Sequence, residues 1–317
     1  MTISANASAP LPTTLHIGMA KAGSSTIQGV LQTARETLAA QGILYPRDLL
    51  PNGSTGGDNQ KCLAVCNTRE ADHFVLRQHR VRNPQDRARF NQRVTQLYTE
   101  QIAQARAAGA GLCLLSAEHF WSSLNSDREL GWLANKLRDV GLRVDRLVFY
   151  IRSQSDWLES KQHQSVREGA EPLDMSIAAL KAQPFYQRLP HDHVAALWQA
   201  AFPDARFELR LFDSRDFVKG DLMSDFKAAA GLDADLPAAP QREQPVERRG
   251  QCDDPPEPAG PRGGPDHGRG LAAQARDLSG AAYAGPLRNA DGARARRHRR
   301  SLRRLERAPA RPVLSGS

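Results

Sequence analysis

The sequence has few of the features that mark membrane-spanning, secreted or metal-binding proteins. It contains no apolar run of the about 18 residues that a transmembrane helix needs. Residues 1–14 lack the basic and apolar regions of a secretion signal. Only four cysteines are present, and Cys62 and Cys66 have no Cys or His partners at zinc-ligand spacing. We therefore expect a reduced, cytoplasmic protein that requires no metal.

Residues 241–317 lack lysine, isoleucine and phenylalanine altogether. Arginine, alanine, glycine and proline fill 47 of these 77 positions. The 16 arginines and 9 acidic residues give the segment a net charge of +7, which leaves only +1 for residues 1–240. Such a composition buries too little apolar surface to offset the entropy of ordering, so we expect a disordered tail with at most a solvated helix over 293–305.

Two interpretations of this tail stay open. An arginine-rich tail could bind nucleic acid or acidic polymers. Alternatively, the dominance of residues with GC-rich codons indicates a frameshifted reading of a GC-rich gene, which would impair the enzyme by replacing a native C-terminal segment. Residues 1–240 carry no basic stripe of the kind that nucleic-acid binding requires.

Residues 15–28, with the sequence LHIGMAKAGSSTIQ, predict an anion-binding loop. A short buried strand ends here, a turn of small residues follows at 18–23, and a helix begins at Ser24. Unpaired N–H groups and the positive end of the helix dipole favour a phosphate at such a place. Lys21 adds a mobile charge. The loop does not match the Walker A pattern, because its lysine precedes the second glycine instead of following it.

A second anion site is predicted at the end of a buried strand over 144–151. Arg152 follows this strand directly, and Ser160 lies two turns into the next expected helix. Open α/β sheets bind ligands at the carboxyl ends of their strands. There, a guanidinium can hold a phosphate with two N–H groups, and a hydroxyl can supply another donor.

Together these two segments resemble the bacterial sulfotransferase-domain family, whose donor is 3′-phosphoadenosine 5′-phosphosulfate (PAPS). The resemblance covers residues 13–237 and implies that Arg152 and Ser160 bind the 3′-phosphate. The family's closing segment and final helix are not found. Ala22 departs from the commoner Ser or Thr of the family's 5′-phosphosulfate loop. The residues that the resemblance assigns to this loop are Lys21, Ala22, Gly23, Ser24, Ser25 and Thr26.

Strands alternate with helices between residues 13 and 240, which predicts an α/β fold. We expect a three-layer α/β/α domain with a central parallel sheet, in agreement with the P-loop NTPase-like sulfotransferase fold that the resemblance implies. A flexible N-terminus is expected over 1–12. Strands are expected over 111–120 and 206–213. Helices are expected over 84–107, 130–140 and 221–232, and one or two more over 173–201.

Three residues are candidates for catalysis. Lys21 is suited to neutralise the charge that develops on the bridging oxygen of the donor. The acceptor hydroxyl needs a base, and the resemblance points to the end of the strand over 111–120, where Glu118 and His119 stand. Glu118 matches the family pattern, whereas His119 has the more suitable ordinary pKa. His16, inside the first strand, is expected in the core. Asp58, Asn59 and Lys61 are further candidates for acceptor contacts.

The sequence therefore predicts a PAPS-dependent sulfotransferase acting on a hydroxyl of a carbohydrate or small metabolite. A P-loop kinase of small molecules is the alternative enzyme, and it predicts Mg²⁺ dependence. The alternative that is not an enzyme is a protein that binds nucleic acid through its arginine-rich tail. It predicts that binding of RNA or DNA weakens steeply as the salt concentration rises.

Overall fold

A computed structural model describes residues 9–237 of the chain. The chain divides into two units, Met1–Pro240 and Gln241–Ser317, and the described residues all belong to the first. The predicted tail, its helix over 293–305 and most of the predicted N-terminal segment lie outside the described residues.

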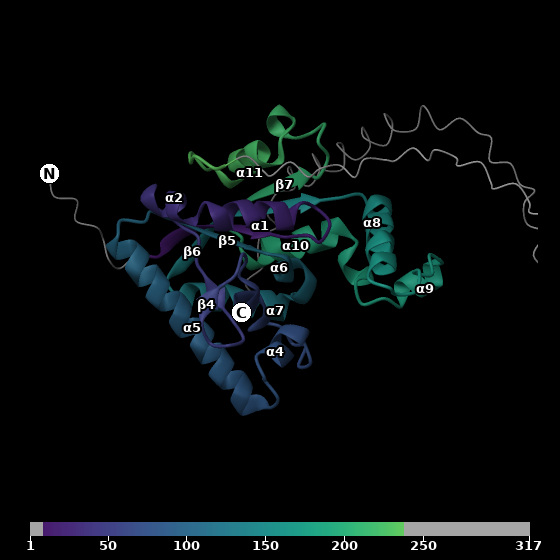
Figure 1. Cartoon of the computed structure of the whole chain (residues 1–317), viewed down its shortest axis with the longest axis horizontal. Coiled ribbons are helices and arrows are strands. Elements are labelled where there is room, and N and C mark those ends of the chain that lie inside the picture. Colours follow the sequence, from purple (N-terminus) through teal and green to yellow (C-terminus); the bar gives the residue numbers. More distant parts are fainter. Residues whose placement is uncertain (1–8, 238–317) are drawn as a thin grey trace, which may run out of the picture. The chain divides into compact units, whose positions relative to one another are not determined.

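A five-stranded parallel sheet forms the centre of the described unit, with the order β2-β5-β1-β6-β7 (Figure 1). The strands are β1 (Leu11–Ile17), β2 (Ile43–Leu44), β5 (Leu112–Ala117), β6 (Leu142–Ile151) and β7 (Arg206–Leu211). The chain runs from central β1 to edge strand β2, returns to β5 beside β1, and then crosses to β6 on the other side of β1. The order of the strands thus reverses around β1, the arrangement that places a ligand crevice at the carboxyl ends of the strands.

Helices cover both faces of the sheet, which confirms the predicted α/β class. On one face α1 (Ser24–Thr33) packs against α11 (Leu222–Ala230), and on the other α7 (Asp127–Asp139) packs against α10 (His191–Ala201) (Figure 1). The remaining helices are α2 (Arg35–Ala40), α3 (Lys61–Val65), α4 (Phe74–Gln78), α5 (Pro84–Ala107), α6 (Glu118–Ser123), α8 (Gln154–Arg167) and α9 (Ile177–Lys181). Short 3-10 turns span Tyr186–Arg188 and Val218–Gly220, and β3 (Asp48–Leu49) forms an antiparallel pair with β4 (Thr55–Gly56).

The core lies along the two central strands. Leu15 and Ile17 of β1 and Leu147, Val148 and Phe149 of β6 have no exposed surface. Both strands are covered on two faces, so their sequences are apolar over consecutive residues rather than at alternate ones. No helix within 9–237 is both long and apolar enough to span a membrane.

The strand predicted over 111–120 extends beyond the C-terminal end of the observed strand. β5 stops at Ala117, and Glu118 begins α6. The chain leaves the sheet where β1 also ends, because Ile17 and Ala117 pair in register. By contrast, the prediction for 84–107 is confirmed: the Asn83 side chain accepts a hydrogen bond from the Asp86 N–H, and Pro84 occupies the first turn.

Candidate functional site

The loop between β1 and α1 presents unpaired backbone donors. Gly23 caps α1 in the left-handed conformation, with φ 78°. Its carbonyl accepts the N–H groups of Thr26 and Ile27, at 3.0 and 3.1 Å. Within the described chain, the N–H groups of Gly23, Ser24 and Ser25 have no hydrogen-bond acceptor. The helix therefore begins with free donors and a positive dipole end, as anion binding requires.

Two glycines let this loop close tightly on its surroundings. A Cβ at Gly23 would lie 2.5 Å from Cε2 of Phe212, and the positive φ would strain any other residue there. A Cβ at Gly18 would lie 3.0 Å from the carbonyl carbon of Ala117. The Gly18 N–H instead donates to the Ala117 carbonyl, at 3.2 Å. Gly18 thus brings the loop directly against the start of α6, where Glu118 stands.

Lys21 lies at the turn of the loop with an unusual backbone. Its φ is 64°, one of three positive values among the non-glycine residues of the described region. Its ammonium forms neither a hydrogen bond nor an ion pair with any residue in 9–237. Burial lowers the pKa of Lys21, while the neighbouring Glu118 carboxylate acts to raise it. Among the described residues, Lys21 is therefore a partly buried cation without a hydrogen-bond or ion-pair partner for its ammonium.

Two side chains from the second predicted motif bind this loop. Arg152, directly after β6, donates from Nη1 to the Lys21 carbonyl at 3.3 Å. Trp157 of α8 donates from Nε1 to the Ala20 carbonyl at 2.9 Å. The structure thus brings together segments about 130 residues apart in the sequence. Ser160 lies one turn after Trp157 on α8 and is partly exposed.

Glu118 joins this group from the end of β5. Burial raises the pKa of its carboxyl, and the charges of Lys21 and Lys161 act to lower it. Lys161, on α8, also acts on Lys21, so the three charged groups share one neighbourhood. No residue of the described part donates a hydrogen bond to the Glu118 carboxylate. A partly buried carboxylate with a raised pKa beside a cation is a typical feature of functional sites.

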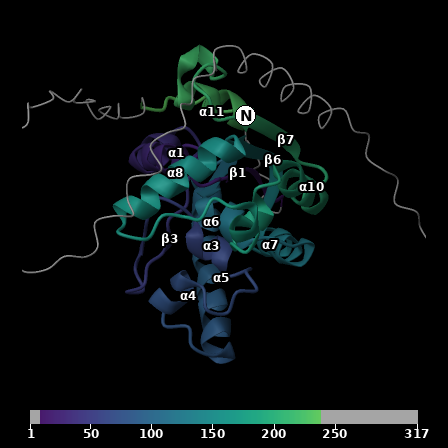
Figure 2. The same cartoon turned by 90° about the vertical axis from the view of Figure 1, so that its right-hand side faces the viewer.

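His119 faces a different cluster. Its ring centroid lies 5.5 Å from those of both His73 and Phe74. Burial lowers its pKa to about 4, and the charges of His73 and Lys61 act in the same direction. Its Nδ1 atom is buried and has no partner in the described region. Helix α3, which carries Lys61, packs against α6 on this side (Figure 2).

His16 lies in the core, as expected. Its Nδ1 is 2.8 Å from Oγ of Ser116, and burial lowers its pKa to about 3. A chain of amides that the sequence did not predict continues from this pair. Gln28 donates to Ser116 Oγ at 3.3 Å, and Asn59 donates to Gln28 at 3.4 Å. No sequence signal marks Gln28, because its role depends on the packing of α1 against β5.

The chain of amides ends in the loop that carries Asp58 and Asn59, two of the residues predicted as candidates for contacts with the acceptor substrate. Asn59 also donates to the Asp58 carboxylate, at 2.9 Å. The Tyr45 hydroxyl donates to the Asp58 carbonyl. The Oδ1 atom of Asn59 is buried and has no partner in the described region. These hydrogen bonds hold the loop in place, and the Oδ1 atom of Asn59 is its one buried side-chain acceptor without a donor in the described region.

The residues present around this loop fit an anionic group. Free backbone N–H groups, hydroxyls, Lys21 and Arg152 all act as donors to anions. No group of three or more His, Cys, Asp or Glu side chains that could hold a metal ion occurs in the region described.

Comparisons with known proteins assign no family. No family model matches the chain. An uncharacterized protein of Archaeoglobus fulgidus is 34% identical over 96 residues, which make up 30% of this chain and 24% of that protein. The match therefore spans about a quarter of that relative's length. A solved sulfotransferase from Alicyclobacillus acidocaldarius superposes with a TM-score of 0.39 and 15% identity, covering 74% of this chain and 87% of that one.

Proposed function

We propose that this protein is a sulfotransferase that moves a sulfuryl group from PAPS to a hydroxyl of a carbohydrate or small metabolite. The observation that carries the proposal is the meeting of Lys21, Glu118 and Arg152 at the ends of three adjacent parallel strands. A cation, a partly buried carboxylate and a guanidinium converge there on a loop with free N–H donors.

Each group has a role in this proposal. The loop 21–26 binds the 5′-phosphosulfate, and Arg152 and Ser160 bind the 3′-phosphate. Arg152 uses one N–H on the loop carbonyl and retains others for a phosphate. Because Arg152 also binds the Lys21 carbonyl, binding of the 3′-phosphate would affect the conformation of the loop that binds the 5′-phosphosulfate.

Sulfuryl transfer forms a bond from the acceptor oxygen to sulfur and breaks the bond from sulfur to the bridging phosphate oxygen. Glu118 accepts the proton of the acceptor hydroxyl, for which its raised pKa is suited. Lys21 neutralises the charge that the departing phosphate oxygen gains. His119 is the second candidate for the base. Its neutral imidazole could accept a proton, but its ring contacts His73 and Phe74.

Thermal unfolding of the purified protein with different nucleotides tests the proposal. We expect 3′,5′-ADP to raise the melting temperature in the presence of a chelator, because a ligand that binds only the folded state stabilises it. Equal stabilisation by 5′-AMP would argue against a 3′-phosphate site. A larger effect of ATP with Mg²⁺ would favour the kinase. Loss of nucleotide binding in Arg152→Ala, with the exposed Arg138→Ala as control, would locate the site.

A further inference from the structure

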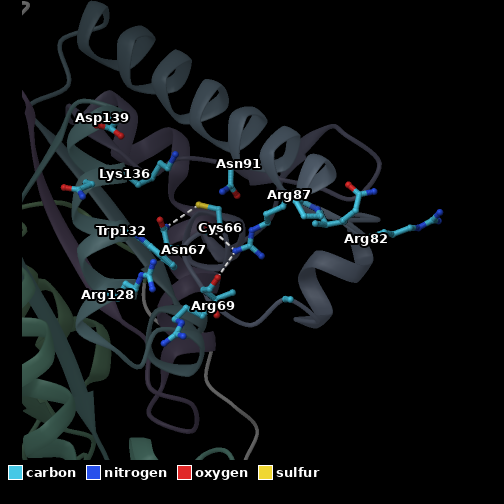
Figure 3. Close-up of a pocket in the computed structure, with 16 residues that line it drawn as sticks. Cys66, Asn67, Arg69, Arg82, Arg87, Asn91, Arg128, Trp132, Lys136 and Asp139 are labelled. Carbon is cyan, nitrogen blue, oxygen red and sulfur yellow. Dashed lines mark hydrogen bonds between the residues drawn. The ribbon is translucent and has the colours of Figure 1, made fainter.

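A cavity of the described unit lies away from the proposed catalytic loop. Its volume is about 780 Å³, and it lies among the segment that follows α3, the first turns of α5 and one side of α7 (Figure 3). Lys21, Glu118, Arg152 and Ser160 do not line it. The volume is that of a site for a small ligand.

The walls of this cavity are strongly cationic. Five cationic side chains line it against the single carboxylate of Asp139. None of the five lies within 4 Å of a carboxylate in residues 9–237, although ion pairs occur elsewhere in that region. Lys136 donates a hydrogen bond to Oγ1 of Thr95 at 2.8 Å, which leaves its charge without a carboxylate partner in that region. Cations without carboxylate partners, gathered at one concave surface, favour an anionic ligand. The five are Arg69, Arg82, Arg87, Arg128 and Lys136.

One of these cations also builds the floor of the cavity. Arg87 of α5 donates from Nη2 to the carbonyls of Val65, Cys66 and Thr68, at 3.1, 3.3 and 2.8 Å (Figure 3). These carbonyls lie at and just beyond the end of α3. Glu129 of α7 holds the same segment by accepting the N–H of Arg69 at 2.7 Å. The cavity is therefore held open by fixed groups from three helices.

The cavity also offers contacts that a simple inorganic anion would not use. Trp132 of α7 is 39% exposed, and the Arg128 guanidinium lies 5.0 Å from its ring centroid. Asn91 of α5 also lines the cavity, and its side chain points toward Arg87 (Figure 3). An amide at the wall of a cavity can form a hydrogen bond with a ligand hydroxyl.

We propose that this cavity binds an acidic saccharide. Carboxylate or sulfate groups of such a ligand would meet the cations, and a hydroxyl would form a hydrogen bond with the Asn91 amide. The apolar face of a pyranose ring would pack on Trp132 beside Arg128. An acidic saccharide supplies the negative charge, the hydroxyl groups and the flat apolar ring face that these contacts call for. The inference does not rest on sulfuryl transfer, since it uses none of the residues of that site.

Calorimetric titration of the full chain with tri-galacturonate tests this proposal. We expect saturable binding, at least about tenfold tighter than that of a neutral galactose trisaccharide or of inorganic sulfate, because charge-assisted hydrogen bonds and hydroxyl contacts act together. Sulfate binding as tightly as the saccharide would overturn the proposal, since the cavity would then recognise charge alone. Tighter binding of 3′,5′-ADP at the same cavity would overturn it as well.

Variants locate the binding within the chain. Arg128→Ala and Trp132→Ala should each weaken it about tenfold or more, and the exposed Arg138→Ala, on the same helix but outside the cavity, should not. Asn91→Leu should also weaken binding, because it removes the amide that would form a hydrogen bond with a ligand hydroxyl at the cavity wall. Residues 241–317 carry 16 arginines, so binding that none of these three cavity substitutions weakens arises elsewhere and overturns the proposal.

Discussion

Lys21 combines a strained backbone with an amine that has no protein partner in the described region. A left-handed conformation costs a non-glycine residue about 1–2 kcal/mol, and such strain is concentrated at functional sites. The loop holds this conformation because Arg152 and Trp157 bind the carbonyls of Lys21 and Ala20. The position of Lys21 is therefore set by hydrogen bonds to the loop backbone rather than by an ion pair of its amine.

Replacing Lys21 should separate catalysis from nucleotide binding. We expect Lys21→Gly to lower sulfuryl transfer by about 10²–10³-fold, as loss of one charge-stabilising group does, and to lower the affinity for 3′,5′-ADP far less. The product nucleotide lacks the developing charge that the amine meets in the transition state. Initial rates and calorimetric titration measure the two effects. Lys21→Ala is the matched control for the backbone: it removes the amine as well, but it keeps the strained left-handed conformation that glycine would relieve. Losses of equal size in both measurements would make Lys21 a binding residue only.

Glu118 and His119 are adjacent in sequence but face different neighbours. We expect Glu118→Gln to lower turnover by about 10²–10⁴-fold, the usual contribution of a general base, with little change in nucleotide affinity. His119→Asn should have a smaller effect, since its ring packs on His73 and Phe74. The pH profile of turnover in both variants gives the test. A larger loss in His119→Asn would assign the base to the histidine.

At the level of elements, helix α8 acts as a support for the loop that follows β1. Trp157 packs on Trp121 and Phe185, with ring centroids 5.8 and 5.0 Å away, while its indole N–H reaches the Ala20 carbonyl. Ring packing therefore fixes the position of the donor. The same helix carries Ser160 and Lys161, so movement of α8 would change several groups of the site at once.

Trp157→Phe should loosen the loop and largely keep the packing. We expect a loss of about 1 kcal/mol in the free energy of unfolding, the usual contribution of one hydrogen bond, together with weaker binding of 3′,5′-ADP. Urea denaturation and calorimetric titration measure these. Trp198→Phe is the control, because Trp198 packs on Phe120 and Phe202 on the other face of the sheet. An unchanged nucleotide affinity in Trp157→Phe would show that the tether does not shape the site.

On the scale of the whole molecule, buried histidines make stability depend on pH. Burial lowers the pKa of His16 to about 3 and that of His79 and His119 to about 4. Unfolded histidine binds a proton near pH 6.5, so the unfolded chain binds more protons below that pH and stability falls as the pH is lowered. Asp48 acts the other way over pH 6 to 4, because burial raises its pKa to about 6.

Burial also lowers the pKa of His73 and raises that of Glu118. We therefore expect the free energy of unfolding to decrease between pH 7 and pH 5, since four histidines oppose two carboxyl groups. Urea denaturation at the two pH values measures the decrease. His16→Gln should reduce the difference between them, whereas the exposed His193→Gln should leave it unchanged. A stability that rises on acidification in the unmodified protein would contradict the expectation.

We also propose that residues 13–240 form the enzyme domain and that 241–317 are not part of its core. Limited proteolysis should then remove the tail first and leave a fragment ending near residue 240. The apolar content of the tail is too small to offset about 1–2 kcal/mol of backbone entropy for each ordered residue. A tail that resists protease, or whose removal unfolds the domain, would show that it belongs to the fold.

The sequence alone determined the local features of this protein. The apolar strand over 144–151, the turn at 18–23 and the helix over 84–107 were predictable, because strand burial, glycine turns and helix caps depend on residues close together in the chain. The end of α11 at Gly231 follows the same rule, because its φ of 66° is the left-handed conformation in which glycine caps helices.

Only the tertiary structure decided which of these features meet. The binding of Arg152 and Trp157 to the loop, the neighbourhood of Lys21 and Glu118, and the turn of His119 toward His73 all depend on the register of β1 with β5 and β6. The cationic cavity likewise joins α5 and α7 to the segment after α3, and no local pattern marks it. Long-range packing sets these contacts, since side chains far apart in the sequence are brought together only when the sheet is assembled.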